Sequence, residues 1–270
     1  MAPTVLITGA SQGIGKATAL LFAQNGYNTV LAARREEPLA QVAQEVQNLG
    51  RTALSVSCDV KDPQQVNTLV DKALAQYGNI DVLVNNAGIY ISGPVEQFSL
   101  EDWHQAIDTN LWGYIHTIHA LLPHMLARGS GTIVNLASIG GKVPIPYLVP
   151  YCTSKFAVNG LTEAMHSELK PKGIHVCGIY PNVIRSSLME RAIFRGKDEE
   201  DAQARRQQLE QVISVPVVEK PEDVAKAVWD GVKNQRAEIL VGSASVSKAA
   251  YGLLPGVMQW VFRQGFKQKA

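Results

Sequence analysis

Short apolar runs alternate along the chain with longer stretches in which apolar residues recur at helical spacing. The first run, residues 5–7, fits a strand buried in a parallel sheet. Further strands are predicted at residues 28–33, 52–57, 81–84, 132–136, 174–179 and 238–241. Helices are predicted after the first strand, at residues 39–49 and 63–77, from about residue 99, and at 154–169 and 221–232. This alternation predicts a single α/β domain, a doubly wound parallel sheet with helices on both faces.

Two of the predicted helices carry start signals. Asp62 and Pro63 suit the N-cap and the first position of the helix at 63–77. Ser99, followed three residues later by Asp102, resembles a capping box.

One segment departs from the alternation. Residues 186–215 have a charged centre between apolar flanks and fit neither a strand nor a regular crossover helix. We expect either a solvated insertion or a lid over the carboxyl ends of the strands, where ligands bind in such sheets. The predicted domain is therefore 1–242, with a lid at about 186–215 and a C-terminal tail at 243–270.

Composition excludes several classes of protein. The 270 residues are 46% hydrophobic and 18% charged, which is ordinary for a globular protein, and a net charge of +1 gives no electrostatic basis for binding nucleic acid. Cys58, Cys152 and Cys177 are widely separated and have no metal-ligand spacing, so we expect free thiols and no metal site. No apolar run reaches the roughly 18 residues of a membrane span. The first strand begins at once, without a signal peptide, and the expected location is the cytoplasm.

A glycine-rich turn lies between the first strand and the first helix. It reads Thr8, Gly9, Ala10, Ser11, Gln12, Gly13, Ile14, Gly15. Glycines let the backbone turn tightly and approach a pyrophosphate, and the helix N-terminus offers unpaired N–H groups. The motif is weak alone, but its position between strand and helix predicts a dinucleotide site.

A second set of residues carries acid–base chemistry. Tyr151 and Lys155 stand four apart at the start of a helical pattern and share one face. An ammonium beside a phenol lowers the pKa of the phenol, which makes tyrosine a usable acid and base. Ser138 ends a strand and is either a substrate ligand or a turn residue. Asn110, a poor helix former inside a helical pattern, indicates a helix irregularity or a water site.

Together these motifs resemble the short-chain dehydrogenase/reductase family of the single-domain type, over about residues 4–242. The resemblance rests on residues 8–15, Asp59, residues 85–88, Asn110, Ser138, Tyr151, Lys155 and Pro181. It implies a Rossmann-type fold and a nicotinamide dinucleotide cofactor.

The resemblance also implies a role for each catalytic residue. Tyr151 is the general acid/base, and Lys155 holds the nicotinamide ribose and lowers the pKa of the tyrosine. Ser138 orients the substrate oxygen, and Asn110 maintains a water-linked proton path to Lys155. Asp59 contacts the adenine amino group.

The expected cofactor site is larger than this catalytic set. It comprises Gly9, Ser11, Gln12, Gly13, Ile14, Gly15, Arg34, Arg35, Asp59, Val60, Asn86, Ala87, Gly88, Tyr151, Lys155, Pro181, Val183 and Ser186. Two positions depart from the family pattern. Asn182 replaces a glycine, and Ser186 stands where threonine is usual but keeps the hydroxyl.

The end of the second strand favours NADP over NAD. An acid there would bind the ribose 2′-hydroxyl of NAD, but the chain has Ala33, followed by Arg34 and Arg35. An arginine fork suits a phosphate. The alternative is that both arginines are solvated residues at a helix start. Ser11 and Gln12 are neutral, whereas family members that prefer NADP often have a basic residue in this turn.

The residues expected near the substrate are almost wholly apolar, which favours a lipophilic ketone or secondary alcohol. They are Tyr90, Ile91, Ile139, Val143, Ile145, Pro146, Leu148, Val183, Leu188 and Met189. Arg185, Arg191 and Arg195 could bind an anionic group, but we expect solvated surface positions. The alternative functions are a dinucleotide-dependent epimerase and a non-catalytic dinucleotide sensor. The intact set of Ser138, Tyr151 and Lys155 argues against the sensor.

The tail contains a predicted amphipathic helix at residues 255–266. The apolar residues on one side are Val257, Met258, Val261, Phe262 and Phe266. The opposite side is polar, with Gln259, Arg263 and Lys267, and Trp260 interrupts the division. Such a face is buried on its own domain or the substrate mouth, on a second subunit, or on a membrane surface, which the basic end with Lys269 also suits. We expect protein contact and a homo-oligomer, as is usual for proteins resembling this family, with peripheral membrane contact as the alternative.

Overall fold

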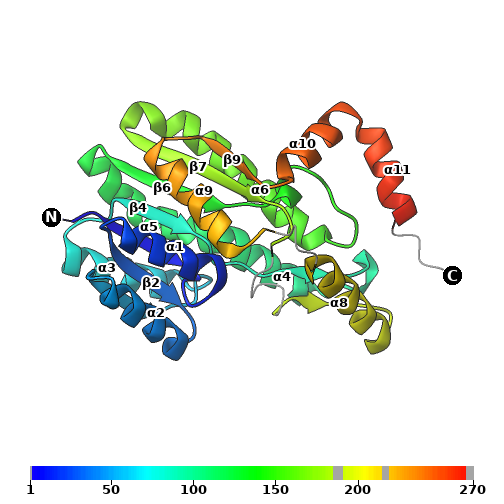
Figure 1. Ribbon diagram of the computed structural model, residues 1–270, viewed down its shortest axis with the longest axis horizontal. Helices are drawn as coiled ribbons and strands as arrows, with labels where there is room; N and C mark the ends of the chain where they lie inside the picture. Colours follow the sequence, from blue (N-terminus) through cyan, green and yellow to red (C-terminus); the bar gives the residue numbers. More distant parts are fainter. Residues whose placement is uncertain (1, 185–190, 215–218, 266–270) are drawn as a thin grey trace.

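A seven-stranded sheet organises the computed structural model, which describes residues 2–184, 191–214 and 219–265 (Figure 1). Its strands are β1 (Thr4–Thr8), β2 (Asn28–Ala33), β3 (Ala53–Ser57), β4 (Val82–Asn85), β6 (Gly131–Leu136), β7 (Ile174–Pro181) and β9 (Glu238–Val241). All neighbours pair in parallel, in the order β3-β2-β1-β4-β6-β7-β9. The order reverses beside β1, so a crevice forms at the carboxyl ends of β1 and β4, where such folds bind ligands.

Helices cover both faces of the sheet and confirm the doubly wound α/β fold. They are α1 (Gly13–Gln24), α2 (Glu36–Asn48), α3 (Pro63–Tyr77), α4 (Leu100–Ile107), α5 (Gly113–Arg128), α6 (Val149–Leu169) and α9 (Pro221–Lys233). Buried residues of α1, α2 and α9 form one core with the sheet, and those of α3, α5 and α6 form the other. The predicted starts of α3 and α4 are confirmed: Asp62 accepts hydrogen bonds from Gln64 N and Gln65 N, and Ser99 and Asp102 form the capping box.

The described part of residues 186–215 contains a strand and a helix that the sequence pattern did not predict, while its role as an insertion or a lid stays a prediction. Strand β8 (Ile193–Phe194) pairs in parallel with β5 (Ile91–Ser92), and α8 (Glu199–Ser214) is a regular helix. The sequence pattern hid this helix because it has few apolar residues. Its acidic first turn suits the positive end of the helix dipole. Residues 185–190 and 215, including Arg185, Ser186, Leu188 and Met189, lie outside the described residues.

An ion pair fastens this segment to α4. Arg195, expected at a solvated position, directs Nε and Nη2 at the carboxylate of Asp102, at 2.9 and 2.7 Å. The carboxylate is buried and also accepts hydrogen bonds from the backbone N and the hydroxyl of Ser99. The Asp102 side chain therefore caps a helix and anchors the β8 strand at the same time.

The C-terminal tail folds as two helices. The sequence did not predict α10 (Ala244–Leu253), whereas α11 (Pro255–Gly265) matches the prediction closely. In α11, Met258 and Phe262 are half-buried, while Val257, Trp260 and Val261 are exposed. The predicted apolar side is thus only partly buried, and Trp260, which interrupts the predicted division, is exposed. Phe266, Lys267 and Lys269 lie outside the described residues, and within the described ranges no helix is long and apolar enough to cross a membrane.

The Asp102–Arg195 pair generates a stability prediction. Replacing Asp102 by Asn leaves Arg195 without its charged partner, so we expect a loss of about 1–2 kcal/mol of unfolding free energy at pH 7. Hydrogen bonds from Arg195 and Ser99 hold the pKa of Asp102 below its usual range. Its stabilising contribution is therefore present above the unfolded pKa of about 3.9, and is lost as pH falls through the folded pKa.

Urea unfolding of the wild type and the D102N variant at pH 7 and in mild acid measures this effect. The two stabilities should converge as pH falls below about 4. Asp71→Asn, on the exposed surface of α3, is the matched control and should change stability by less than about 0.5 kcal/mol at either pH. Equal losses in both variants would show that the ion pair contributes nothing specific.

Candidate active site

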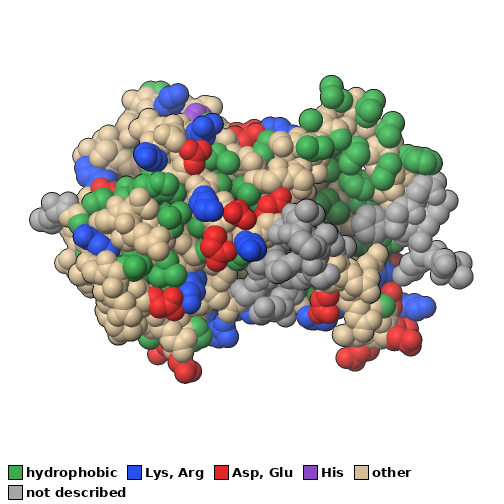
Figure 2. Space-filling model, in the orientation of Figure 1, with side chains coloured by type: hydrophobic (Ala, Val, Ile, Leu, Met, Phe, Trp, Pro, Cys, Tyr) green, Lys and Arg blue, Asp and Glu red, His purple; other side chains and the backbone are tan. Residues whose placement is uncertain are grey.

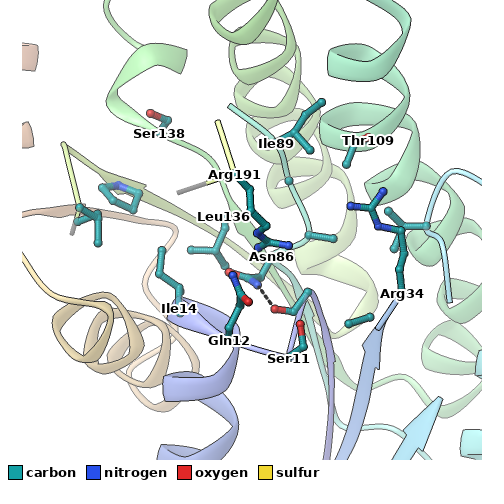
Figure 3. Close-up of a pocket in the computed structure, with 18 of the residues that line it drawn as sticks. Ser11, Gln12, Ile14, Arg34, Asn86, Ile89, Thr109, Leu136, Ser138 and Arg191 are labelled. Carbon is teal, nitrogen blue, oxygen red and sulfur yellow. Dashed lines mark hydrogen bonds between the residues drawn. The ribbon is translucent and has the colours of Figure 1, made fainter. Parts of the chain in front are cut away.

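A cavity of about 510 Å³ opens at the carboxyl ends of the central strands (Figure 3). Most of the predicted cofactor residues line it: Gly9, Ser11, Gln12, Gly13, Ile14, Arg34, Arg35, Asp59, Val60, Asn86, Ala87, Gly88, Tyr151, Lys155 and Pro181. Ser138 lines it too, whereas Gly15, Asn110 and Val183 do not. The topology thus brings residues from the carboxyl ends of six strands, and from α1 and α6, to one cavity.

The glycine turn is held in a shape that only glycine permits. Gly9 has a φ of +65°, in the left-handed region, and a Cβ on Gly15 would lie 2.3 Å from Gly9 O. Gly15 therefore allows α1 to pack closely on the loop after β1 rather than lining the cavity. This packing leaves the N-terminus of α1, with its unpaired N–H groups, facing the cavity. The cradle fits a dinucleotide pyrophosphate.

Asn86 fastens the same turn to the end of β4. Its Nδ2 donates to Thr8 O at 2.9 Å and to Gly9 O at 3.2 Å. In return, the hydroxyl of Thr8 accepts hydrogen bonds from the backbone N of Asn86 and of Ala87, both at 3.0 Å. These bonds fix the two loops on either side of the point where the strand order reverses.

Asn110 occupies a π-helical turn, Asp108–Trp112, between α4 and α5, which confirms the predicted helix irregularity. Its side chain is fully buried: Nδ2 donates to Ile89 O at 3.1 Å and to Ser154 Oγ at 3.0 Å, and Oδ1 accepts from Ile89 N at 2.8 Å. It thereby ties the loop after β4 to α6. The contacts seen for Asn110 do not include Lys155, so the implied proton path stays a prediction.

Ser138 and Tyr151 meet on the cavity wall. Helix α6 begins at Val149, five residues earlier than predicted, so that Tyr151 and Lys155 lie one turn apart in it. The hydroxyl of Ser138, at the end of the β6 loop, hydrogen-bonds the phenol of Tyr151. The ring of Tyr90 packs against Tyr151 with 5.1 Å between the ring centres. The phenol is thus held in a fixed position.

Burial dominates the ionisation of the Tyr151–Lys155 pair. It raises the pKa of Tyr151 to about 12, against the lowering effect of the Ser138 hydrogen bond. It also lowers the pKa of Lys155 to about 7. Lys155 Nζ donates to Leu136 O at 2.7 Å and lies 5.9 Å from the centre of the Tyr151 ring. Lys155 is not among the causes of the Tyr151 shift, so the lowering of the tyrosine pKa by lysine stays a prediction.

The other end of the cavity is basic. Arg34 lines the wall after β2, and Arg35 donates a hydrogen bond to the side chain of Gln12 in the glycine turn. Asp59 is the one carboxylate among the described lining residues, and it accepts a hydrogen bond from Lys61 N. No acid therefore stands at the end of β2, where Ala33 lines the cavity.

Several lining residues were not predicted. They are Ala33, Cys58, Ile89, Thr109, Leu136, Ala137, Asn182, Ile184 and Arg191. Most of them are neighbours of predicted residues at the same strand ends. Arg191 is different, because it was expected at a solvated position, and Figure 3 shows it beside Leu136 and Asn86. Arg191 reaches the cavity because β8, which begins two residues later, pairs with β5. No local sequence pattern predicts that pairing.

The predicted substrate residues divide into two groups around the site. Tyr90 and Leu148 form an apolar cluster with Tyr151, Cys152 and Ala192. In the second group, Ile139 and Val143 pack against Ala244 of α10 instead, while Ile145 borders both clusters. The remaining described residues, Ile91, Pro146 and Val183, do not line the cavity.

Residues 3–198 match the sequence profile of the family described as short chain dehydrogenase. The chain belongs to this family of oxidoreductases. It is 32% identical to the ketoacyl reductase HetN of Nostoc sp. over 259 residues, which cover 95% of this chain and 84% of that protein.

Two solved structures of the family are similar throughout. A short chain dehydrogenase/reductase from Burkholderia phymatum in complex with NAD has a TM-score of 0.86 and 27% identity, with 95% of each chain covered. An alcohol dehydrogenase from Thermococcus sibiricus complexed with 5-hydroxy-NADP has a TM-score of 0.74 and 27% identity, with 89% of this chain and 96% of that chain covered. The family uses a nicotinamide dinucleotide, and the glycine cradle fits one.

The lowered pKa of Lys155 predicts proton uptake on cofactor binding. With a pKa of about 7, most Lys155 side chains are neutral at pH 8. The phosphates of NADH bring negative charge into the cavity, which favours the ammonium and raises the pKa. Binding at pH 8 should therefore take up a fraction of a proton, measured calorimetrically in buffers of different ionisation enthalpy.

The Lys155→Met variant should lose this uptake. Lys72→Met, on the exposed side of α3, is the control and should keep it. An uptake that persists without Lys155 would assign the proton to another group.

Proposed function

We propose that the protein is an NADP(H)-dependent carbonyl reductase that acts on lipophilic ketones and, in reverse, on secondary alcohols. The observation that carries the proposal is the contact between Ser138 and Tyr151 on the cavity wall, with Lys155 one helical turn further. Donors placed at the position of a substrate oxygen, next to a buried basic group, suit proton transfer to a carbonyl.

The raised pKa of Tyr151 gives it the role of acid. With a pKa of about 12, the phenol is protonated at neutral pH and can give its proton to the carbonyl oxygen. The bound dinucleotide supplies the hydride that reaches the carbonyl carbon. Ser138 holds the carbonyl oxygen by donating a hydrogen bond. The ammonium form of Lys155 favours the phenolate left behind, which regains its proton from solvent.

The basic end of the cavity supports NADP as the cofactor. Ala33 presents no carboxylate that would repel a 2′-phosphate, and Arg34 lines the wall next to it. A guanidinium pairs with phosphate oxygens through two parallel hydrogen bonds. Arg35 is bound to Gln12, which leaves Arg34 as the better-placed phosphate ligand.

The surroundings of Tyr151 support a lipophilic substrate. The cluster beside its ring consists of Tyr90, Leu148, Cys152 and Ala192, with Phe194 packed against it. An apolar wall favours a substrate with hydrocarbon on both sides of its carbonyl over a sugar or an acid. The ketoacyl group named for the relative HetN is a ketone on an acyl chain and belongs to this class.

Replacing Tyr151 by Phe tests the proposed acid. The variant removes the proton donor and keeps the ring, so turnover should fall about 10²–10⁴-fold. The Kd of NADPH should change little. A panel of hydrophobic ketones, followed by loss of NADPH absorbance, measures turnover. Tyr77→Phe, on α3, is the matched control. Wild-type turnover in the Tyr151 variant would show that another group donates the proton.

A double variant tests the cofactor assignment. Ala33→Asp with Arg34→Ser removes the phosphate ligand and adds a repelling carboxylate. We expect the ratio of NADPH to NADH affinity to fall at least about tenfold, because a charge-assisted hydrogen bond contributes about 1.5–3 kcal/mol. Fluorescence titration with both cofactors measures it. Tighter binding of NADH than of NADPH by the wild type would contradict the assignment.

A further inference from the structure

Helices α10 and α11 expose an apolar surface that we call the tail patch. It consists of Val246, Leu253, Leu254, Val257, Trp260 and Val261, whose exposed fractions run from 44% for Val261 to 80% for Leu253. Figure 2 shows hydrophobic side chains gathered over this end of the molecule, where Figure 1 places α10 and α11. Contiguous apolar surface of this kind marks a binding surface.

The described part of the domain leaves the tail patch exposed. Ala244 of α10 is buried, and Tyr251 and Phe262 pack against Ile139 and Val143 in the loop after β6. These contacts fix which side of the two helices faces the domain. The side that bears Leu253, Leu254, Val257 and Trp260 is therefore turned away from it.

Two partners remain for the tail patch, a second copy of the chain and a membrane surface, and the charge of the tail favours the membrane. Of the 25 Lys and Arg and 24 Asp and Glu residues of the chain, residues 243–270 hold four basic residues and no acid. The basic residues are Lys248, which forms an ion pair with Glu238 of β9, and Arg263, Lys267 and Lys269, for which the sequence alone gives the charge. A segment that joins exposed apolar side chains to an excess of Lys and Arg suits the surface of an anionic bilayer.

A second copy of the chain fits this surface less well. In a two-fold dimer the same segment of both chains meets at the interface, so the net positive charge of the tail sequence is present on both sides of it. Like charges across an interface oppose association. The exposed Trp260 also favours a membrane surface, because tryptophan is enriched where a protein meets the polar boundary of a membrane.

We propose that the tail patch binds the surface of anionic phospholipid bilayers. The contact is peripheral, with the side chains of α10 and α11 entering the boundary between headgroups and acyl chains. The proposal does not depend on the proposed reductase activity. It complements that activity, because Ile139, which packs beneath the tail, directly follows Ser138. The bilayer then lies beside the loop that carries Ser138, which suits a lipophilic substrate.

Co-sedimentation of the full chain with vesicles tests the proposal. The protein should pellet with vesicles of equal phosphatidylcholine and phosphatidylglycerol, and not with phosphatidylcholine alone. Salt should weaken the binding. The triple variant Leu253→Gln, Leu254→Gln, Val257→Gln should bind at least tenfold more weakly. These side chains are exposed, so its turnover and NADPH binding in solution should match the wild type.

A control variant tests whether vesicle binding requires the tail patch in particular or only exposed apolar residues in general. Leu49→Gln, Val95→Gln, Leu100→Gln changes the same residue types at exposed positions elsewhere and should bind vesicles like the wild type. Brominated phospholipids should quench Trp260 fluorescence. Trp260→Phe should lose that quenching and still pellet, because phenylalanine keeps the residue apolar.

Two results would overturn the proposal: failure of the wild type to pellet with anionic vesicles, or pelleting of the tail variant to the same extent as the wild type. Light scattering is measured in parallel, to show whether the tail variant falls from a larger assembly to a smaller one when the wild type does not bind vesicles. Such a fall would assign the patch to a second copy of the chain. If the protein shows no reductase activity, the conclusion from the vesicle experiment is unchanged.

Discussion

The close approach of α1 to the loop after β1 is the constraint on which the site depends. A side chain at position 15 would collide with Gly9 O, so glycine there sets how deeply the helix N-terminus reaches toward the cavity. Asn86 then fixes this loop to the end of β4 by bonding Thr8 O and Gly9 O. The shape of the phosphate cradle and the relative position of the loops after β1 and β4 depend on this junction, which lies where the strand order reverses.

The sequence predicted the sheet and most helices because their signals are local. Asp62 and Ser99 cap their helices with their own side chains, and apolar periodicity marks the core strands. It failed for β8, α8 and α10. Helix α8 has few apolar residues, β8 is only two residues long, and α10 packs on the loop after β6, far away along the chain. Strand β8 has two residues and exists through its pairing with β5 and the Arg195–Asp102 ion pair.

The residues of the candidate site also divide into those that the sequence predicted and those that it did not. Residues at strand ends, such as Ser138 and Asn86, reach the cavity because parallel strands deliver their carboxyl ends to one edge. Arg191 reaches it through the tertiary pairing of β8, which no local pattern encodes. The ionisation of Tyr151 could not be predicted either, because its sign depends on whether burial or the charge of Lys155 dominates.

Burial moves both catalytic groups toward their neutral forms. Burial raises the pKa of Tyr151 to about 12 and lowers the pKa of Lys155 to about 7, so at pH 8 the phenol is protonated and most Lys155 side chains are neutral. A neutral lysine does little to favour a phenolate. An anion bound in the cavity favours the charged ammonium form of Lys155. The ammonium in turn favours the phenolate, so that Tyr151 loses its proton more easily. We therefore expect the acid–base strength of Tyr151 to depend on whether an anion occupies the cavity.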